Sequence, residues 1–316
     1  MSTIVTSQDL HFEGRQIILS DDVYENYIAL EGVDYELQYL NLTSPGNKGG
    51  HSNVFLLLDP DIREVDEYTL VLKVCNYPIE EKRDSILRKR FLREIAALKK
   101  AKSAKSRGVI QIHSSGTIII DTKSYHYYTM EYASNDLTNH LSENEIGTQQ
   151  KIVLCKEILR GIEDLHKIGI YHRDIKHDNM LICGGQCKVG DLGLIRHREN
   201  DTLNEYGNRI GAFGWESPEV MNKYYAERKK KTSNYQESSN SLIDEKSDVF
   251  QLGKLFWYIF VGRIPVGQLD LSDFLLDDHD LFNLLRGMLL QSKENRLDLP
   301  TVKKQLEPIA QRYYAA

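Results

Sequence analysis

Apolar residues at helical spacing mark the longest regular elements of the sequence. Residues 80–102 place four of them on one face, Leu87, Phe91, Ile95 and Leu98. Residues 149–167 do the same with Ile152, Cys155, Ile158, Leu159, Ile162 and Leu165, and Gly169 follows. This spacing predicts two amphipathic helices, the second ended by glycine. Three later stretches are also predicted to be helical, residues 248–262, 281–290 and 299–314.

Shorter apolar runs bounded by polar residues predict strands in the first 130 residues. The runs are residues 12–19, 24–30, 35–42, 69–74, 109–112, 116–121 and 125–130. Two further runs, residues 180–183 and 187–189, flank Gly184-Gly185 and are typical of a hairpin. That hairpin would bring Asn179 back beside Asp191.

Oxygen-bearing side chains gather around this hairpin, namely Asp174, Asp178, Asn179 and Asp191. Carboxylate and amide oxygens suit a hard cation such as Mg²⁺. Lys176 follows Asp174 by two residues, so in an extended loop both side chains point the same way. A base beside a cation suits proton transfer and the stabilisation of an anion.

The order of these residues resembles two motifs of the eukaryotic-type protein kinases, in their Ser/Thr branch. Residues 172–179 have the spacing H-R-D-x-K-x-x-N of the catalytic loop, and residues 191–193 have D-x-G, with Leu192 where the family usually has Phe. An ordinary polar loop followed by a hairpin is the alternative. The resemblance extends over about residues 40–310.

The resemblance implies an α+β, bilobal protein-kinase-like fold with a β-rich N-lobe and a helical C-lobe. The expected parts are residues 41–132 for the N-lobe and 133–316 for the C-lobe, preceded by an extension, residues 1–40, that packs on the small lobe. Residues 222–245 are rich in Lys, Ser, Asn and Gln, which favours a mobile polar insertion. Its basic run, residues 228–231, is either a docking patch or a solvated charge run.

The same resemblance implies ATP and Mg²⁺ as cofactors and assigns the catalytic roles. Asp174 would accept or orient the proton of the substrate hydroxyl, and Lys176 would stabilise the transferring phosphoryl group. Asn179 and Asp191 would hold Mg²⁺. Lys73, at the end of the strand 69–74, would hold the α- and β-phosphates, although a solvent-facing lysine on an edge strand fits the same pattern.

Glu94 lies on the apolar face of the helix predicted over residues 80–102. A carboxylate that faces a core needs a partner, and Lys73 is the partner that the resemblance implies. A glutamate at the rim of the helix, facing water, is the alternative.

The polar stretch 44–55 lies between predicted strands and matches the glycine-rich nucleotide lid of the family. Small residues there let backbone N–H groups approach phosphates, although a polar hairpin turn has a similar composition. Aligned by Val54, the three glycine positions hold Asn47, Gly49 and Ser52, so only the middle glycine is kept.

Residues 130–133 resemble the hinge of the family. Backbone groups of Glu131 and Ala133 would pair with adenine, Met130 would lie at the back of the pocket, and Asp136 would reach the ribose. Val71 and Leu181 complete the predicted nucleotide contacts.

Residues 192–219 resemble the activation segment, which closes with Ser217-Pro218-Glu219, and Arg296 stands where the family pairs an arginine with that glutamate. Ala212 replaces a common threonine, whose hydroxyl could orient Asp174 and Lys176. Asp248 matches an aspartate that holds the backbone of the catalytic loop. Arg173 could bind a phosphate on Thr202 or Tyr206, unless neighbouring acidic residues take that place.

Composition adds only a few limits. The chain has 316 residues, is 41% hydrophobic and carries a net charge of −6, which points to neither nucleic acid nor a membrane as partner. The polar start lacks a signal-peptide pattern, and four cysteines form no disulfide framework, so we expect a cytoplasmic protein. Cys183 and Cys187 have no second pair at zinc spacing, which favours core cysteines.

The resemblance therefore implies an ATP-dependent kinase that phosphorylates Ser or Thr of protein substrates, itself included. Lys176 supports Ser/Thr because tyrosine kinases have a different local sequence. A pseudokinase that binds nucleotide or acts as a scaffold is the rival, favoured by the altered lid, Leu192 and Ala212. A small-molecule kinase fits less well with Glu219 and Arg296. The sequence does not indicate an oligomeric state.

Overall fold

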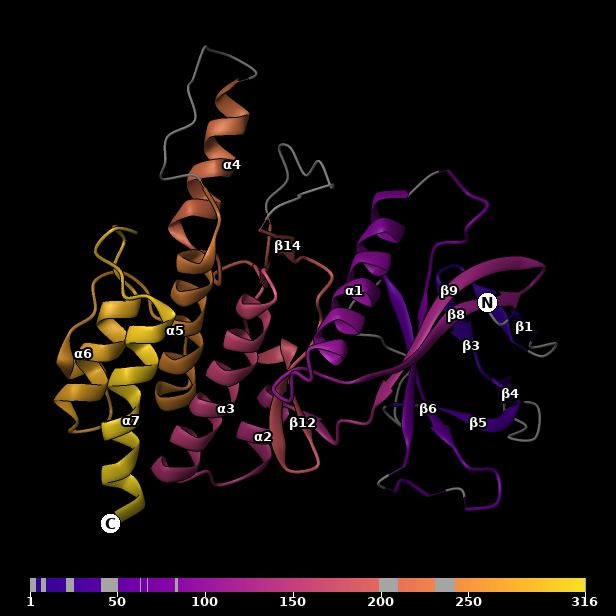
Figure 1. The fold of residues 1–316 in the computed structure, drawn as a ribbon, viewed down its shortest axis with the longest axis horizontal. Coiled ribbons are helices and arrows are strands. Elements are labelled where there is room, and N and C mark those ends of the chain that lie inside the picture. The colour runs from indigo at the N-terminus through magenta and orange to yellow at the C-terminus, as the bar shows by residue number, and fades with distance from the viewer. Residues whose placement is uncertain are drawn as a thin grey trace. The chain divides into compact units, whose positions relative to one another are not determined.

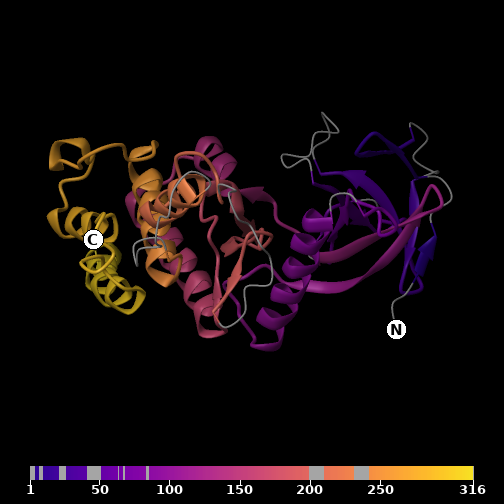
Figure 2. The same cartoon turned by 90° about the horizontal axis from the view of Figure 1, so that it is seen from above.

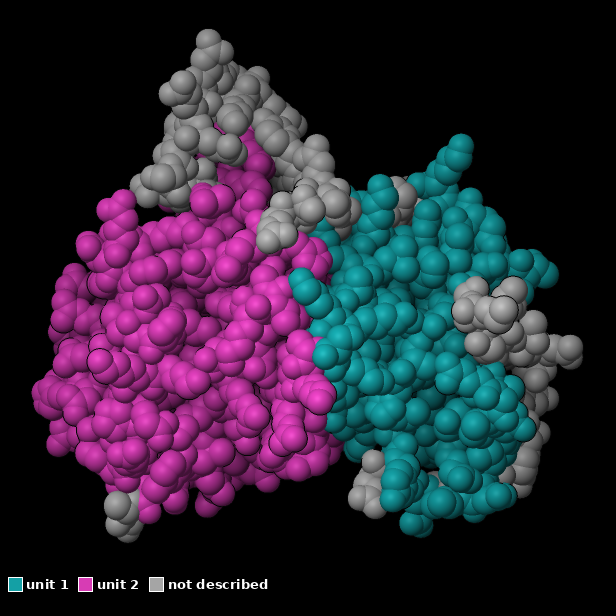
Figure 3. Space-filling view, viewed as in Figure 1, with its two compact units in different colours: residues 1–103, 110–133 teal, residues 104–109, 134–316 magenta. Residues whose placement is uncertain are grey.

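The computed structural model describes most of the chain. The described residues are 4–6, 10–20, 26–40, 51–62, 64–66, 68–82, 85–198, 210–230 and 242–315. They form two compact units, shown in different colours in Figure 3. Unit 1 contains residues 1–103 and 110–133, and unit 2 contains residues 104–109 and 134–316.

Unit 1 is built on a seven-stranded sheet with strand order β1-β8-β9-β7-β6-β5-β4 (Figure 1). The strands are β1 (Ile4–Thr6), β4 (Tyr27–Leu30), β5 (Val33–Tyr39), β6 (Ser52–Leu58), β7 (Leu70–Cys75), β8 (Ile112–Ile120) and β9 (Lys123–Glu131). All neighbours are antiparallel except β1, which pairs parallel with β8. Among the described residues of this unit, the α-helix is α1 (Ser85–Ser103).

Helix α1 begins five residues later than the periodicity predicted. Glu80 and Glu81 lie before it and contact the start of β9 instead: Ser124 N donates to Glu80 Oε1 at 3.0 Å, and Lys123 Nζ pairs with Glu81 Oε1 at 2.9 Å. Contacts between distant segments therefore prevail over the local helical pattern at this end.

The N-terminal residues contribute to the core of unit 1. Strands β2 (His11–Glu13) and β3 (Gln16–Ile18) form a hairpin that turns at Gly14, where φ is +64°. Leu10 and Ile17 are buried with residues of β4–β9, and Phe12 stacks on Tyr125 with 4.5 Å between ring centroids. The described part of residues 1–40 is thus built into the unit.

Unit 2 is mainly helical. Its helices are α2 (Leu137–Glu143), α3 (Thr148–Lys167), α4 (Pro218–Lys230), α5 (Glu245–Val261), α6 (His279–Met288) and α7 (Leu299–Ala315). Helix α3 contacts α5 and α7, and α6 contacts α5 and α7; both cartoon views show the C-terminal helices side by side (Figures 1 and 2). The sheet-rich first unit and helical second unit agree with the predicted α+β class.

Short strands carry the polar loops of unit 2. They are β10 (Asn135–Asp136), β12 (Met180–Cys183) and β13 (Gln186–Val189) in one sheet, and β11 (Ile170–Tyr171) with β14 (Arg196–His197) in another. The predicted hairpin is present as β12 and β13, which pair from Met180 with Val189 to Cys183 with Gln186. Cys183 and Cys187 are buried within it and form no disulfide with another described residue, as expected for core cysteines.

Helix α4 includes residues 222–230 of the segment that we expected to be a mobile insertion. Pro218 and Glu219 at its start favour a helix, because proline suits the first turn and a carboxylate complements the N-terminal end of the helix dipole. Residues 231–241 lie outside the described residues. No helix among the described residues is long and apolar enough to cross a membrane.

Candidate active site

Asp248 organises the backbone of the loop that contains Asp174. This side chain is fully buried on α5, and its two oxygens accept the N–H groups of His172 at 2.8 Å and Arg173 at 2.9 Å. His166 of α3 contacts the same carboxylate at 2.9 Å. Burial alone would raise the pKa of Asp248, but the hydrogen bonds from His166 and the backbone lower it.

The loop needs this support because its backbone is unusual. Arg173 has φ of +67°, a left-handed conformation that costs a non-glycine residue on the order of 1 kcal/mol or more. Gln251, one turn after Asp248 on α5, donates to Arg173 O at 3.1 Å and accepts from Ile175 N at 3.2 Å. Helix α5 therefore holds the backbone on both sides of Asp174.

Asp174 accepts hydrogen bonds at both carboxylate oxygens. Asn179 Nδ2 donates to Oδ2 at 2.9 Å and to the backbone oxygen of Asp174 at 2.7 Å. The backbone N–H of Ala212 donates to Oδ1 at 3.1 Å. Asp174 is 6% exposed, so these bonds hold its buried carboxylate in one orientation.

Ala212 therefore contacts Asp174 without a hydroxyl. We expected its replacement of threonine to remove an orienting group, but the backbone amide supplies one. Gly211 permits this approach: its φ is +92°, and a Cβ there would lie 3.2 Å from Arg173 O and 3.5 Å from Asp174 Oδ1. The sequence contains Gly211 but no local signal for this contact.

Lys176 lies beside the carboxylate, as the loop pattern predicted. Its Nζ is 3.7 Å from Asp174 Oδ2 and 3.9 Å from Asp178 Oδ2. Asp178 has a pKa of about 2, chiefly because His177 donates to it at 2.9 Å. His177 also hydrogen-bonds Thr138 and packs against Trp215 and Tyr258.

The hairpin brings the two predicted magnesium ligands together. Gly190 N donates to Asn179 O at 2.8 Å, so the residue before Asp191 contacts Asn179 directly. Asp191 is exposed, with φ of +47°. Because Asn179 Nδ2 faces Asp174, the amide oxygen faces away from it. An amide oxygen and an exposed carboxylate suit Mg²⁺, which usually takes few protein ligands and completes its shell with phosphate and water.

In unit 1, Lys73 and Glu94 form the predicted ion pair. Lys73 Nζ lies 2.9 Å and 3.1 Å from the two carboxylate oxygens, with the side chains 14% and 4% exposed. Tyr128 also donates to Glu94 Oε1 at 2.9 Å, and Lys73 Nζ lies 5.6 Å from the centre of its ring. The sequence contains no signal for the role of Tyr128 beyond its place in a predicted strand.

Three predicted nucleotide contacts share one face of the sheet in unit 1. Val71 is buried in an apolar cluster with Leu56 and Leu58, and the partly buried Val54 and Met130 pack against it. Strand pairing explains this grouping, because Val71 lies opposite Met130 and Val54 lies opposite Lys73. The partly exposed apolar surface is of the kind on which a flat ring can pack.

The other predicted nucleotide contacts have structural partners. Glu131 N donates to Gln111 O at 3.0 Å, and its carboxylate accepts from Gln111 N at 2.8 Å. Asp136 caps α2 by accepting from Asn139 N at 2.9 Å. Ala133 is half-buried at the end of unit 1, and Leu181 packs against Gly190 on the hairpin. Their roles toward a nucleotide stay predictions.

Several predicted residues lie outside the described residues. They are Asn47 and Gly49 of the lid and the two candidate phosphosites, Thr202 and Tyr206. Arg173 itself is buried, and its guanidinium donates to Leu194 O at 2.6 Å and Ile195 O at 3.2 Å.

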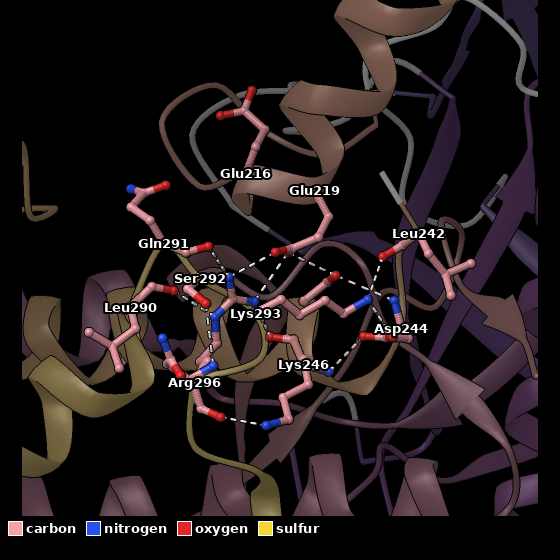
Figure 4. Close-up of polar contacts among 12 residues, drawn as sticks. Glu216, Glu219, Leu242, Asp244, Lys246, Leu290, Gln291, Ser292, Lys293 and Arg296 are labelled. Carbon is pink, nitrogen blue, oxygen red and sulfur yellow. Dashed lines mark hydrogen bonds and ion pairs between the residues drawn. The ribbon is translucent and has the colours of Figure 1, made fainter. Parts of the chain in front are cut away.

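Glu219 and Arg296 form the predicted ion pair at the start of α4 (Figure 4). The guanidinium contacts Glu219 Oε1 at 2.8 Å and Oε2 at 3.1 Å, and its remaining donors reach backbone oxygens of Lys246, Leu290 and Gln291. Burial tends to raise the pKa of Glu219, but the bonds from Arg296 lower it. Both side chains are almost fully buried, so they are strongly dependent on each other.

Comparison with known proteins places these elements in a family. A sequence model described as protein kinase domain matches residues 48–310. Similar curated proteins include the dual specificity protein kinase TTK of Mus musculus, 23% identical over 269 residues, which are 80% of this chain and 29% of TTK. The serine/threonine-protein kinase mph1 of Schizosaccharomyces pombe is 28% identical over 74% of this chain and 32% of its own length.

A third relative is the serine/threonine-protein kinase pakA of Talaromyces marneffei, 28% identical over 58% of this chain and 26% of its own length. The chain thus spans no more than about a third of these three relatives. The family match covers the strands that carry Lys73, the loop that carries Asp174 and the helices that support it. The predicted α+β kinase-like fold is confirmed, and the chain belongs to the eukaryotic-type protein kinase family.

Proposed function

We propose that this chain is an ATP-dependent protein kinase that transfers the γ-phosphoryl group to Ser or Thr hydroxyls of protein substrates, itself included. The observation that carries the proposal is the arrangement around Asp174. Its carboxylate is oriented by Asn179 and the Ala212 amide, and the Lys176 ammonium lies 3.7 Å away. Phosphoryl transfer requires an oriented carboxylate for the attacking hydroxyl and a cation for the transferring phosphoryl group.

Asp174 orients the attacking hydroxyl and accepts its proton. Lys176 stabilises the negative charge of the transferring group, and the two carboxylates beside its ammonium hold it in place. Lys73, held by Glu94, contacts the α- and β-phosphates. Mg²⁺, when bound, neutralises charge on the phosphates, and Asn179 and Asp191 are the residues that would hold it.

Ser/Thr preference is supported by Lys176 and by relatives named as serine/threonine kinases. One relative is named a dual specificity kinase, so the acceptor class needs its own measurement. The measurement uses recombinant protein, [γ-³²P]ATP, Mg²⁺ and peptide libraries with Ser, Thr or Tyr at the fixed position. We expect transfer to Ser and Thr peptides and to the protein itself. Phosphotyrosine as the main product would contradict this preference.

A pseudokinase remains the second candidate because Asn47 and Ser52 replace two lid glycines and Leu192 replaces the usual Phe. The same assay separates the two. Transfer that requires Mg²⁺ and is absent in Asp174→Asn supports catalysis by this chain. Nucleotide binding by calorimetry with no transfer to any peptide, with Asp174→Asn indistinguishable from wild type, would support the pseudokinase.

A further inference from the structure

Tyr128 stands next to the Lys73–Glu94 pair as a direct consequence of the sheet register. Strands β7 and β9 pair Lys73 with Tyr128, so the two side chains lie on the same face of the sheet. Tyr128 Oη donates to Glu94 Oε1 at 2.9 Å, the oxygen that Lys73 Nζ also contacts at 2.9 Å. The three side chains come from β7, α1 and β9.

Burial makes this hydroxyl important for Glu94. Tyr128 is 1% exposed and Glu94 3% exposed, so water cannot replace a lost partner easily. A buried carboxylate is stable only when its oxygens accept hydrogen bonds. Phe91, one turn before Glu94 on α1, packs on the Tyr128 ring with 5.4 Å between centroids and restricts the position of that ring.

Tyr128 serves as a permanent donor. Burial, and then the neighbouring Glu94 charge, raise the pKa of its hydroxyl well above 10. The hydroxyl therefore stays protonated near neutral pH, and it donates its hydrogen bond to Glu94 Oε1.

We propose that Tyr128 is a positioning residue that fixes the Glu94 carboxylate and, through it, the Lys73 ammonium. The proposal rests on the proposed function, since Lys73 is the residue that would meet the phosphates. Lys73 has three N–H donors and must share them between Glu94 and a nucleotide. The Tyr128 hydroxyl holds Glu94 independently of that sharing, so α1 and Lys73 keep their relative position when the phosphates bind.

Tyr128→Phe removes the hydroxyl and keeps the ring. We expect kcat/KM for ATP to fall roughly tenfold, in line with a hydrogen bond to a charged group. The matched control is Tyr127→Phe: Tyr127 is the adjacent residue, equally buried, and belongs to the apolar core with Leu72 and Val74 on the opposite face of the sheet. We expect its kcat/KM to stay within about twofold of wild type.

A double-mutant cycle separates positioning from general loosening. If Tyr128 acts through Glu94, adding Tyr128→Phe to Glu94→Ala should change kcat/KM by less than about twofold. A further tenfold loss in the Glu94→Ala background would overturn the proposal. Circular dichroism and thermal unfolding of each variant establish that it is folded.

Labelling of Lys73 gives a readout that needs no phosphoryl transfer. An acyl-phosphate derivative of ATP acylates a lysine beside its phosphates, and peptide mass spectrometry measures the rate at Lys73. We expect the rate to fall severalfold in Tyr128→Phe and not in Tyr127→Phe. Equal rates in the two variants would refute the positioning role. An inactive wild-type protein that still shows this difference would refute the proposed function alone.

Discussion

At the scale of single residues, the carboxylate of Asp174 is oriented by one side-chain amide and one backbone amide. Asn179 contributes a side-chain amide, which a substitution can remove. Ala212 contributes a backbone amide, which no substitution except proline can remove. The orientation of Asp174 therefore depends as much on the path of the chain through Gly211 as on the identity of any side chain.

Asp174→Asn tests the proposed base without a large change of shape. The amide cannot accept a proton and presents an NH₂ group to donors from Asn179 or Ala212. We expect kcat to fall by roughly 10²- to 10⁴-fold while ATP affinity changes little. Initial rates and calorimetric binding of ATP measure the two effects. Full turnover by this variant would remove Asp174 from the catalytic assignment.

Asp191→Asn tests the metal role at the exposed end of the hairpin. The variant keeps an oxygen donor but loses the charge, so affinity for Mg²⁺ with nucleotide should weaken at least severalfold. ATP binding measured with Mg²⁺ and with EDTA separates this from direct phosphate binding. We expect the difference to shrink in Asp191→Asn. The control is Asp270→Asn, because Asp270 lies far along the chain and caps the short 3₁₀ helix Leu271–Asp273. An unchanged Mg²⁺ dependence of ATP binding in both variants would contradict the assignment.

At the scale of elements, the hairpin that carries Asn179 and Asp191 is held against α3 by a close backbone contact. Gly161 of α3 lies so near residue 108 that a Cβ would be 2.3 Å from Gly108 O and 2.5 Å from Val189 Cγ2. Val189 N donates to the same Gly108 oxygen at 2.9 Å. Glycine is needed on this face of α3 although it weakens a helix.

Gly161→Ala should therefore destabilise unit 2, even though alanine favours helices. Because the atoms nearest to the new Cβ belong to the backbone and to a buried valine, the clash is relieved only if α3 moves. We therefore expect a loss of roughly 2–4 kcal/mol in unfolding free energy. Urea denaturation measures it. Gly147→Ala, at the start of the same helix with only a side-chain oxygen at 3.9 Å, is the control and should lie within about 1 kcal/mol of wild type.

At the scale of the whole molecule, buried carboxylates with lowered pKa values couple stability to pH. Glu219 and Asp248 both have folded pKa values below their ordinary values of 4.5 and 3.8. The unfolded chain then binds protons that the folded chain does not bind. The contribution of these two carboxylates to the unfolding free energy is complete at pH values above their ordinary pKa values. It is lost as the pH falls from the ordinary pKa values toward the folded ones.

We expect the unfolding free energy to fall as the pH decreases from about 5 to 3. Arg296→Gln should lower stability at pH 7 by roughly 3–5 kcal/mol, because it leaves Glu219 buried without its cation. It should also make the decrease with acid shallower, because Glu219 no longer has a lowered pKa. The exposed pair of Lys123 and Glu81 supplies the control: Lys123→Gln should cost about 1 kcal/mol or less. Parallel pH curves for wild type and Arg296→Gln would contradict the coupling.

Local patterns were enough to predict much of the site. The periodicity of α1 places Glu94 on its apolar face, and Gly184-Gly185 between two apolar runs predicts the hairpin that returns Asn179 to the neighbourhood of Asp191. The spacing of residues 172–179 predicts that Lys176 lies beside Asp174. These features depend on residues a few positions apart, whose geometry follows from the regular repeat of helices, turns and strands.

Contacts between distant residues were decided by the tertiary structure. Tyr128 meets Glu94 across 34 positions because strand register places it opposite Lys73. Ala212 reaches Asp174 across 38 positions because Gly211 adopts a positive φ. Side chains and amides of these types occur throughout the sequence, and nothing in their neighbours marks a partner. Only the packing of sheet, helix and loop selects it, because a buried polar group must find its hydrogen bonds within the fold.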